Sequence, residues 1–404
     1  MRRMPITIGV LVLATCVSAF ATGSVQASDP LSGDRRTDRF TVDSASLQEK
    51  REVIVRLPSD YHEEMNSYPV LYVTDAAWQF PVIAEYIEYL VYWKRIPPMI
   101  VVGVPTPDRN RDFVPRVDAQ FPDSGGADKF LPFLLEELQS TIDGRYRSAG
   151  IDILFGHSFG GVLSLYTLFK APDAFEAYIA VGTSTWVADR VLFDEANAFF
   201  DAGKSSDAMI FMSVAEADGG PTVPVGQEFA ELWKRRASET LEWSFHVEPE
   251  ASHFTALVPS LRRALDLLYP AWGFTAELRL RIDADGPAAV DRWFEYQHAT
   301  LGWRFFPQTM ELGELAFELA AAGNFDGARA LTARLRKEAP RSPGVYEISS
   351  YVEMYASAPE HALGFVRQAI AIGEEIDFFP SRLQTYRNLA AQLEAELSDT
   401  RGNR

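Results

Sequence analysis

The chain has almost no cysteine, too few basic residues to balance its acidic ones, and no apolar run long enough to be a good membrane span. Its single cysteine, Cys16, excludes an internal disulfide and a metal site built from several cysteines. Lysine and arginine number 38 against 56 for aspartate and glutamate, which gives a formal net charge of −18. A field of that sign argues against nucleic acid as a partner and against attachment to an anionic membrane surface.

The remaining composition is that of an ordinary globular protein. Apolar residues make up 47% and charged residues 23% of the 404 residues, which excludes a disordered or collagen-like chain. At roughly 150 residues per domain, the length predicts two to three domains with ample room for a buried core.

The N-terminus has the three parts of a secretory signal peptide. Two arginines provide a positive start, a short apolar stretch follows, and small residues end it. We predict a signal peptide over residues 1–27, a flexible lead-in over residues 28–39, and a secreted, periplasmic protein. A lipoprotein anchor at Cys16 is the alternative.

Seven short runs of β-forming residues predict the strands of an α/β domain over residues 40–272. Several of the runs are apolar throughout, which is typical of strands buried on both faces of a parallel sheet. The runs are 53–57, 70–73, 99–104, 151–155, 177–181, 209–214 and 244–247. Helical patterns lie between them, at 128–142, 160–170, 229–238 and 260–268. Strands that alternate with helices predict a mostly parallel sheet flanked by helices.

The last part of the chain, residues 285–400, has no strand-like run and is rich in alanine, leucine and glutamate. Small residues recur in it at an offset of 34, as at Ala328 and Ala362, where they let antiparallel helices approach closely. This predicts a small all-α domain of two tetratricopeptide-like repeats, and a generic helical hairpin is the alternative. Because two such repeats rarely stand alone, we expect the tail to dock on the α/β domain or on a protein partner.

The sequence Gly156-His157-Ser158-Phe159-Gly160 fits the motif G-x-S-x-G. A predicted strand precedes it and a helical pattern follows, which is the context of a nucleophile elbow. Glycine at both ends removes side chains that would clash in so tight a turn, and the serine hydroxyl is then presented at the carboxyl edge of the sheet. We predict Ser158 as a catalytic nucleophile; the alternative is a glycine-rich turn without chemistry.

A serine hydroxyl needs a general base at neutral pH. Of six histidines, His253 follows the last predicted strand and precedes the final helix of the α/β domain, so it is predicted as that base. The acid that orients the imidazole should follow the strand at 209–214, where Asp218 and Glu216 are both candidates. Asp218 is favoured because a small-x-x-Asp turn would curl its carboxylate back toward the strand edge.

Two backbone amides are expected to stabilise the oxyanion of the transition state. One belongs to Phe159, directly after the nucleophile. The other is that of Ala77, with Ala76 as its neighbour, in a loop that follows the strand at 70–73.

Trp78 and His157 are predicted to line the substrate pocket, with a core position as the alternative for Trp78. Loops over 105–125 and 183–207 would shape the same pocket. None of these roles requires a metal ion or an organic cofactor, so neither is expected.

Six motifs follow one another between residues 40 and 270. They are residues 68–75, 102–115 with Arg109, Arg111, Asp112 and Pro115, 125–130, 136–138, 156–161 and 252–254. In this order they resemble the putative-esterase branch of the α/β-hydrolases, which includes esterase D-like, feruloyl-type and enterochelin or siderophore esterases. Asp75-Ala76 stands where that branch usually has Asp-Gly, and Ala215 stands where its acid turn usually begins with Gly.

These residues predict a serine carboxylester hydrolase that forms an acyl-enzyme on a small-molecule ester. The resemblance adds siderophore esters as candidate substrates. Two alternatives remain open: an acyltransferase with the same triad, and a scaffold protein that acts through the helical tail.

Overall fold

A computed structural model describes residues 37–59, 61, 67–270, 272, 275–301, 309–376 and 378–402. The predicted signal peptide lies outside the described residues, and so does the lead-in up to residue 36. The lead-in prediction is wrong at its end, because strand β1 already begins at Thr37 and pairs with β2. Strand β1 was not predicted, because it is an edge strand with alternating exposure and contains no continuous apolar run.

An eight-stranded sheet forms the centre of the first unit, in the order β1-β2-β4-β3-β5-β6-β7-β8. The β1–β2 and β2–β4 pairs are antiparallel, and every pair from β4 to β8 is parallel. The strands are β1 (Thr37–Ser44), β2 (Glu49–Arg56), β3 (Tyr68–Val73), β4 (Ile100–Gly103), β5 (Ser148–His157), β6 (Ala177–Val181), β7 (Met209–Ala215) and β8 (Trp243–Glu248). All seven predicted strands are present, and the prediction of a mostly parallel sheet flanked by helices is confirmed.

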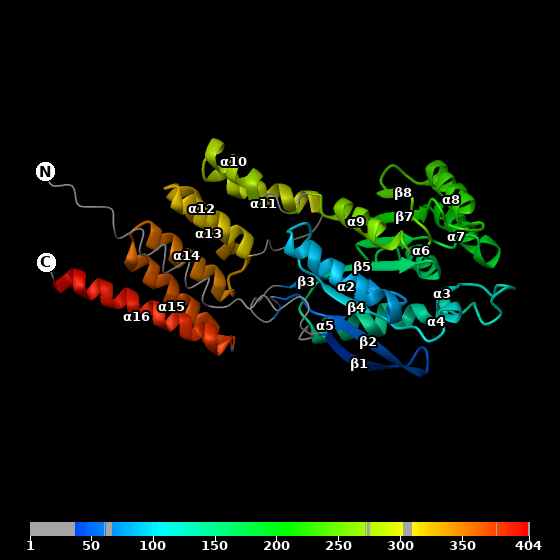
Figure 1. The fold of residues 1–404 in the computed structure, drawn as a ribbon, viewed down its shortest axis with the longest axis horizontal. Coiled ribbons are helices and arrows are strands. Elements are labelled where there is room, and N and C mark those ends of the chain that lie inside the picture. Colours follow the sequence, from blue (N-terminus) through cyan, green and yellow to red (C-terminus); the bar gives the residue numbers. More distant parts are fainter. Residues whose placement is uncertain are drawn as a thin grey trace.

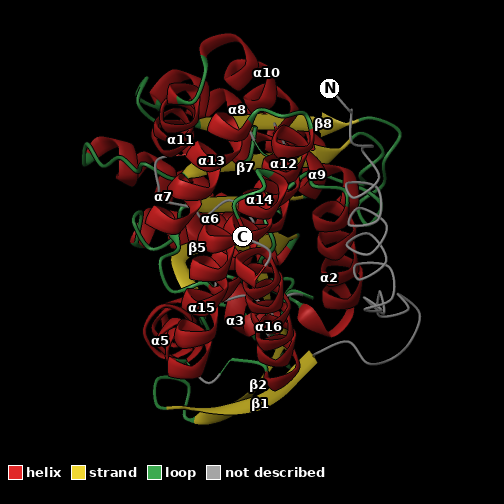
Figure 2. Ribbon diagram, turned by 90° about the vertical axis from the view of Figure 1, so that its left-hand side faces the viewer, coloured by secondary structure: helices red, strands yellow, loops and turns green. Residues whose placement is uncertain are grey.

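Helices cover both faces of this sheet, and Figure 2 shows α2 and α9 on one side of the strands with α5, α6 and α7 on the other. Two separate apolar cores result, one on each face. The helices of this unit are α2 (Ala76–Tyr92), α3 (Arg109–Phe113), α4 (Ala127–Pro132), the π-helical segment η1 (Phe133–Leu138), α5 (Gln139–Arg145), α6 (Phe159–Lys170), α7 (Val187–Asp201), α8 (Thr222–Arg236) and α9 (Leu257–Leu268). Strand β3 is buried throughout and β5 is buried at residue 151 and over residues 153–157, which explains the apolar runs in both strands.

Two of these helices occupy segments that were predicted as loops. Helix α2 replaces the loop after β3, because Phe80, Ile83 and Ile87 bury one face at helical spacing. Helix α7 fills most of the loop predicted over 183–207. The single helix predicted over 128–142 is instead three consecutive helical segments, α4, η1 and α5, with Pro132 at the end of the first.

The remaining helices form an all-α unit, as predicted, although it begins at Thr275 rather than near residue 285. Its helices are α10 (Thr275–Asp285), α11 (Ala288–Leu301), α12 (Thr309–Ala321), α13 (Phe325–Glu338), α14 (Pro343–Tyr355), α15 (Pro359–Glu375) and α16 (Pro380–Gly402). Helices α12 and α14 begin 34 residues apart (343 − 309), and so do α13 and α15 (359 − 325). Ala328 and Ala362 are both fully buried. The helices thus repeat at the 34-residue offset on which the prediction of tetratricopeptide-like repeats was based. That the unit consists of such repeats stays a prediction.

The two units lie side by side along the longest axis of the molecule (Figure 1). Lys94, just beyond α2, makes an ion pair of 2.7 Å with Glu314 of α12. Across the described ranges, no helix combines the length and the apolar character that crossing a membrane requires.

One carboxyl group in the sheet predicts a dependence of stability on pH. Burial of Asp152, on β5, raises its pKa to about 7, and the carboxylates of Asp143 and Glu176 add to the effect. A pKa raised by folding means that the native state holds more protons than the unfolded chain between roughly pH 4 and 7, so stability is lost as pH rises through that range.

Replacing Asp152 by asparagine should therefore raise the free energy of unfolding at pH 8 by about 2 kcal/mol and change it little at pH 4. Urea denaturation at both pH values measures the difference. Asp207→Asn, at an exposed carboxylate that is not among the groups that shift the pKa of Asp152, is the matched control and should have a small effect at either pH. Equal effects of Asp152→Asn at the two pH values would contradict the prediction.

Candidate active site

The serine motif forms a sharp turn between β5 and α6. Ser158 has φ 61° and ψ −116°, a strained conformation for a residue with a side chain. A Cβ atom on Gly156 would lie 1.9 Å from the carbonyl oxygen of Gly160, and one on Gly160 would lie 2.3 Å from Thr74 Oγ1. Both positions therefore require glycine, and the turn places Ser158 at the carboxyl end of the parallel strands.

The structure brings His253 together with Asp218. His253 Nδ1 lies 2.8 Å from Asp218 Oδ2, and the Asp218 side chain is only 5% exposed. The turn that carries Asp218 is tied to the histidine loop by a hydrogen bond from Ala217 N to the carbonyl of Ala251. The exposed carboxylate of Glu216 instead accepts a hydrogen bond from the backbone N–H of Glu250, 2.8 Å away. Of the two acids predicted after β7, only Asp218 reaches the imidazole.

The hydroxyl of Ser158 has a neighbour that sequence reasoning did not single out. Its Oγ lies 3.4 Å from Oγ of Ser184, a residue that is 3% exposed. Within the described part of the chain, Ser158 Oγ and His253 are not hydrogen-bonded, and contacts of this kind often tighten only when substrate binds. Ser184 follows β6, the strand beside β5, and that position at the carboxyl edge was the signal that could have identified it.

The two amides predicted for the oxyanion lie at the N-termini of two helices. Phe159 is the first residue of α6 and Ala77 is the second residue of α2. The N–H groups of a first helical turn have no acceptor within their own helix, so they are free to bind an anionic oxygen. The close approach of Gly160 to the β3–α2 turn brings the two helix ends together.

Arg109 connects the two segments that carry these amides. Its guanidinium makes two hydrogen bonds of 2.9 Å to the carboxylate of Asp75, the residue before α2. The same group lies 4.9 Å from the centre of the Phe159 ring. Burial raises the pKa of Asp75, and the bonds to Arg109 counteract that rise. The arrangement holds the β3–α2 turn against the start of α6.

Exposed aromatic rings border the histidine. Trp78 is 45% exposed, which is inconsistent with a core position, and it packs edge-on against Phe254 at 6.0 Å between ring centres. Phe254 is 67% exposed, and it was not predicted as a pocket residue, because no feature of the sequence separates it from its neighbours in the 252–254 motif. The prediction that His157 lines the pocket is wrong, because its side chain is fully buried and packs against the ring of His253.

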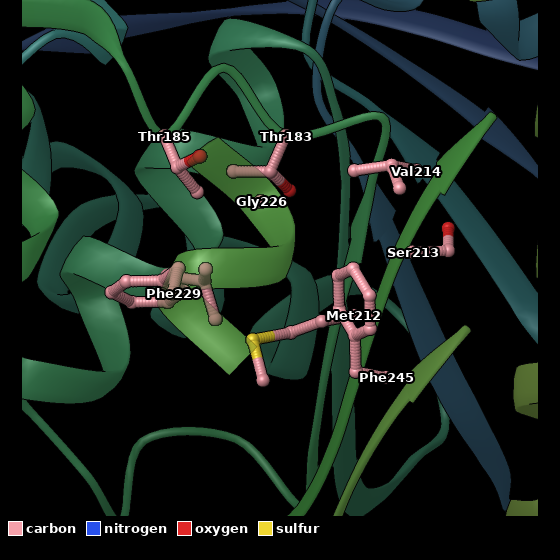
Figure 3. Close-up of a pocket in the computed structure, with 9 residues that line it drawn as sticks. Thr183, Thr185, Met212, Ser213, Val214, Gly226, Phe229 and Phe245 are labelled. Carbon is pink, nitrogen blue, oxygen red and sulfur yellow. The ribbon is translucent and has the colours of Figure 1, made fainter. Parts of the chain in front are cut away.

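A cavity of about 10 Å³ lies beneath the loop that follows β6 (Figure 3). The side chains of Thr183, Met212 and Phe229 line it from that loop, from β7 and from α8. Its volume is close to that of a single water molecule, so it cannot accept an ester. We expect a substrate to approach Ser158 from the exposed side, over Trp78 and Phe254.

Among the described residues, no cluster of three or more histidine, cysteine or acidic side chains is arranged for a metal ion.

Comparison with known proteins adds sequence and fold relatives. The model of the family described as "Putative esterase" matches residues 44–246, about half of the chain. The siderophore triacetylfusarinine C esterase of Aspergillus fumigatus is 37% identical over 84 residues, which cover 20% of this chain and 29% of that relative. The siderophore enterobactin esterase of Emericella nidulans is 30% identical over 161 residues, covering 34% of this chain and 53% of the relative.

The chain thus spans about half or less of the length of these two curated relatives. Among solved structures, an IroE-like serine hydrolase from Shewanella oneidensis has a TM-score of 0.65 at 24% identity. That match covers 75% of this chain and 99% of the other, and it shows a shared fold.

Proposed function

Because this chain belongs to the "Putative esterase" family of α/β-hydrolases, we propose that it is a serine carboxylester hydrolase with Ser158 as nucleophile. His253 acts as general base and Asp218 orients it. The observation that carries the proposal is the strained turn that presents Ser158 on the same sheet edge as the hydrogen-bonded His253 and Asp218.

The reaction follows from the roles of these groups. Ser158 Oγ attacks the ester carbonyl while His253 takes the hydroxyl proton, and the amides of Phe159 and Ala77 bind the oxyanion. His253 then gives the proton to the departing alcohol, which leaves an acyl group on Ser158. Water, deprotonated by His253, attacks that acyl-enzyme and releases the acid. Asp218 stabilises the positive imidazole during both transfers.

The substrate that we propose is a small-molecule ester, with siderophore esters as the first candidates. Two relatives are named for hydrolysing such esters. The exposed rings of Trp78 and Phe254 offer an apolar surface beside His253 on which a ligand could pack. The formal charge of −18 disfavours a strongly anionic ligand.

The place of action belongs to the same proposal. The predicted signal peptide at residues 1–27 supports secretion, to the periplasm in a cell with two membranes. The all-α unit supports a protein partner, since helical repeats present broad binding surfaces.

The test is hydrolysis of p-nitrophenyl esters from acetate to decanoate by the full chain, together with labelling by a fluorophosphonate. We expect turnover of at least the short esters and one phosphonate adduct, located by peptide mass spectrometry on Ser158. Turnover without an adduct, or an adduct on another residue, would contradict the proposal. An adduct with product formed only when an alcohol is added would identify acyl transfer instead of hydrolysis.

A further inference from the structure

His157 lies between the nucleophile and the loop that carries the base. It is the last residue of β5, directly before Ser158, and it has no exposed surface. Its Nε2 is 2.7 Å from the backbone carbonyl oxygen of His253. A carbonyl can only accept a hydrogen bond, so Nε2 carries the proton and donates it. This bond joins two segments that are 96 residues apart in the chain.

The two imidazole rings are packed closely. Their centres are 4.6 Å apart, and Trp78 covers His157 from another side at 5.8 Å. Gly182, with φ 53°, lies against the pair, and a Cβ atom there would be 3.2 Å from His157 Nε2 and 3.4 Å from His253 Cε1. The end of β6 therefore leaves just enough room for both rings.

His157 is held in its neutral form. Burial lowers its pKa to about 4, and the neighbouring His253 adds to the decrease. With the proton on Nε2, its Nδ1 is a buried acceptor that has no partner among the described residues. Because the ring of His157 is neutral, it does not repel the positive charge that forms on His253 during catalysis.

His253 is thus restrained at two points. Asp218 fixes the orientation of the imidazole through Nδ1, and His157 fixes the backbone from which the imidazole projects. We propose that His157 is a positioning residue, which holds the base loop against the nucleophile elbow by donating a hydrogen bond from Nε2 to the His253 carbonyl. This inference rests on the proposed function of Ser158 and His253 and adds a residue to it.

Three substitutions at His157 test the donor. His157→Leu removes it, and His157→Gln places an amide N–H close to the position of Nε2. His157→Asn carries the same amide one bond short of the carbonyl. Because a displacement of about 1 Å at a catalytic group can cost about 10²-fold in rate, we expect kcat to fall roughly 10- to 100-fold in the Leu and Asn variants, with KM nearly unchanged. The Gln variant should recover most of the rate.

Two further measurements accompany the kinetics. The rate of fluorophosphonate labelling should fall in parallel with kcat, because it depends on the same base. Amide hydrogen exchange over residues 250–256 should speed up in the Leu and Asn variants and stay near wild type in the Gln variant. His246→Leu is the matched control, since this half-buried histidine of β8 stacks on Phe211 away from the site and its loss should leave kcat unchanged.

The inference is overturned if His157→Leu matches wild type in kcat, labelling and exchange, or if Asn restores these quantities as fully as Gln. Should the Leu variant fail to fold, the comparison of Gln with Asn decides alone. Hydrogen exchange needs no turnover, so it reports on His157 even if Ser158→Ala were to remain active and the proposed function were to fail. An inactive Ser158→Ala beside a wild-type-like His157→Leu would reject the role of His157 only.

Discussion

Replacing Ser158 by alanine should lower ester turnover by roughly 10⁵- to 10⁶-fold and abolish phosphonate labelling. The acyl-enzyme cannot form without Oγ, and only the oxyanion amides and substrate binding then remain to assist water. Removing a hydroxyl at the N-terminus of α6 should not unfold the chain, because Gly156 and Gly160 still fit the turn. Steady-state kinetics on a short p-nitrophenyl ester and intact mass after labelling measure both losses.

Ser184→Ala is the control that makes this result specific. Ser184 Oγ is 3.4 Å from Ser158 Oγ, and Ser184 also follows a parallel strand of the sheet, so it is the other hydroxyl that could carry an acyl group. We expect its loss to reduce kcat by less than about tenfold, as removal of one neutral hydrogen bond would. If Ser158→Ala kept its turnover while Ser184→Ala lost it, the nucleophile would be Ser184 and the elbow would serve only as structure.

The central strands could be predicted from sequence because burial on both faces leaves an unmistakable pattern. Residues 70–73 and 177–181 are apolar and fully buried, and no tertiary information is needed to recognise them. Ser158 could be predicted for a related reason, since the geometry of its turn depends on neighbouring glycines within the same short segment. Features that depend only on residues within one short segment, such as a buried strand or a tight turn, can therefore be predicted from that segment alone.

Helix α7 shows what such patterns miss. Residues Ala188, Asp189 and Arg190 form a left-handed turn at its start, which no propensity of these residue types favours. The turn persists because Asp118 Oδ2, from a loop 70 residues earlier, accepts a hydrogen bond of 2.6 Å from the backbone N–H of Ala188. A conformation that is imposed from so far along the chain cannot be read from its own segment.

The side-chain directions at the site depended on long-range contacts in the same way. The sequence placed His157 beside the nucleophile, but only the fold shows that its ring is buried under the base loop. It also left Asp218 and Glu216 open as the acid. The backbone N–H of Glu216 still bonds to the carbonyl of Glu248 on β8, so Glu216 continues the strand edge, whereas Asp218 lies beyond the turn and faces His253.

The contact between Asp218 and His253 leads to the prediction with the second large effect. Asp218→Asn should reduce kcat by about 10³- to 10⁴-fold with little change in KM. An asparagine has nearly the same shape, but its amide can donate to Nδ1 and so favour the wrong tautomer of His253. It also has no negative charge to stabilise the imidazolium. Because asparagine fills the same nearly buried space as the aspartate that it replaces, the melting temperature should change little. Kinetics together with thermal unfolding therefore separate a loss of catalysis from a loss of stability.

Glu216→Gln provides the matched control, since it removes one carboxylate from the same short segment. Its side chain accepts a backbone N–H of Glu250, and an amide oxygen can accept that bond equally well, so kcat should stay within about twofold. The double variant should then be no slower than Asp218→Asn alone, because Glu216 has no part in the step that the first substitution disables. If Glu216→Gln caused the large loss instead, the acid would be Glu216. If kcat of both single variants stayed within tenfold of wild type, His253 would act without a carboxylate. The hydrogen bond from His157 Nε2 to the backbone carbonyl of His253 would then be the remaining restraint on the base.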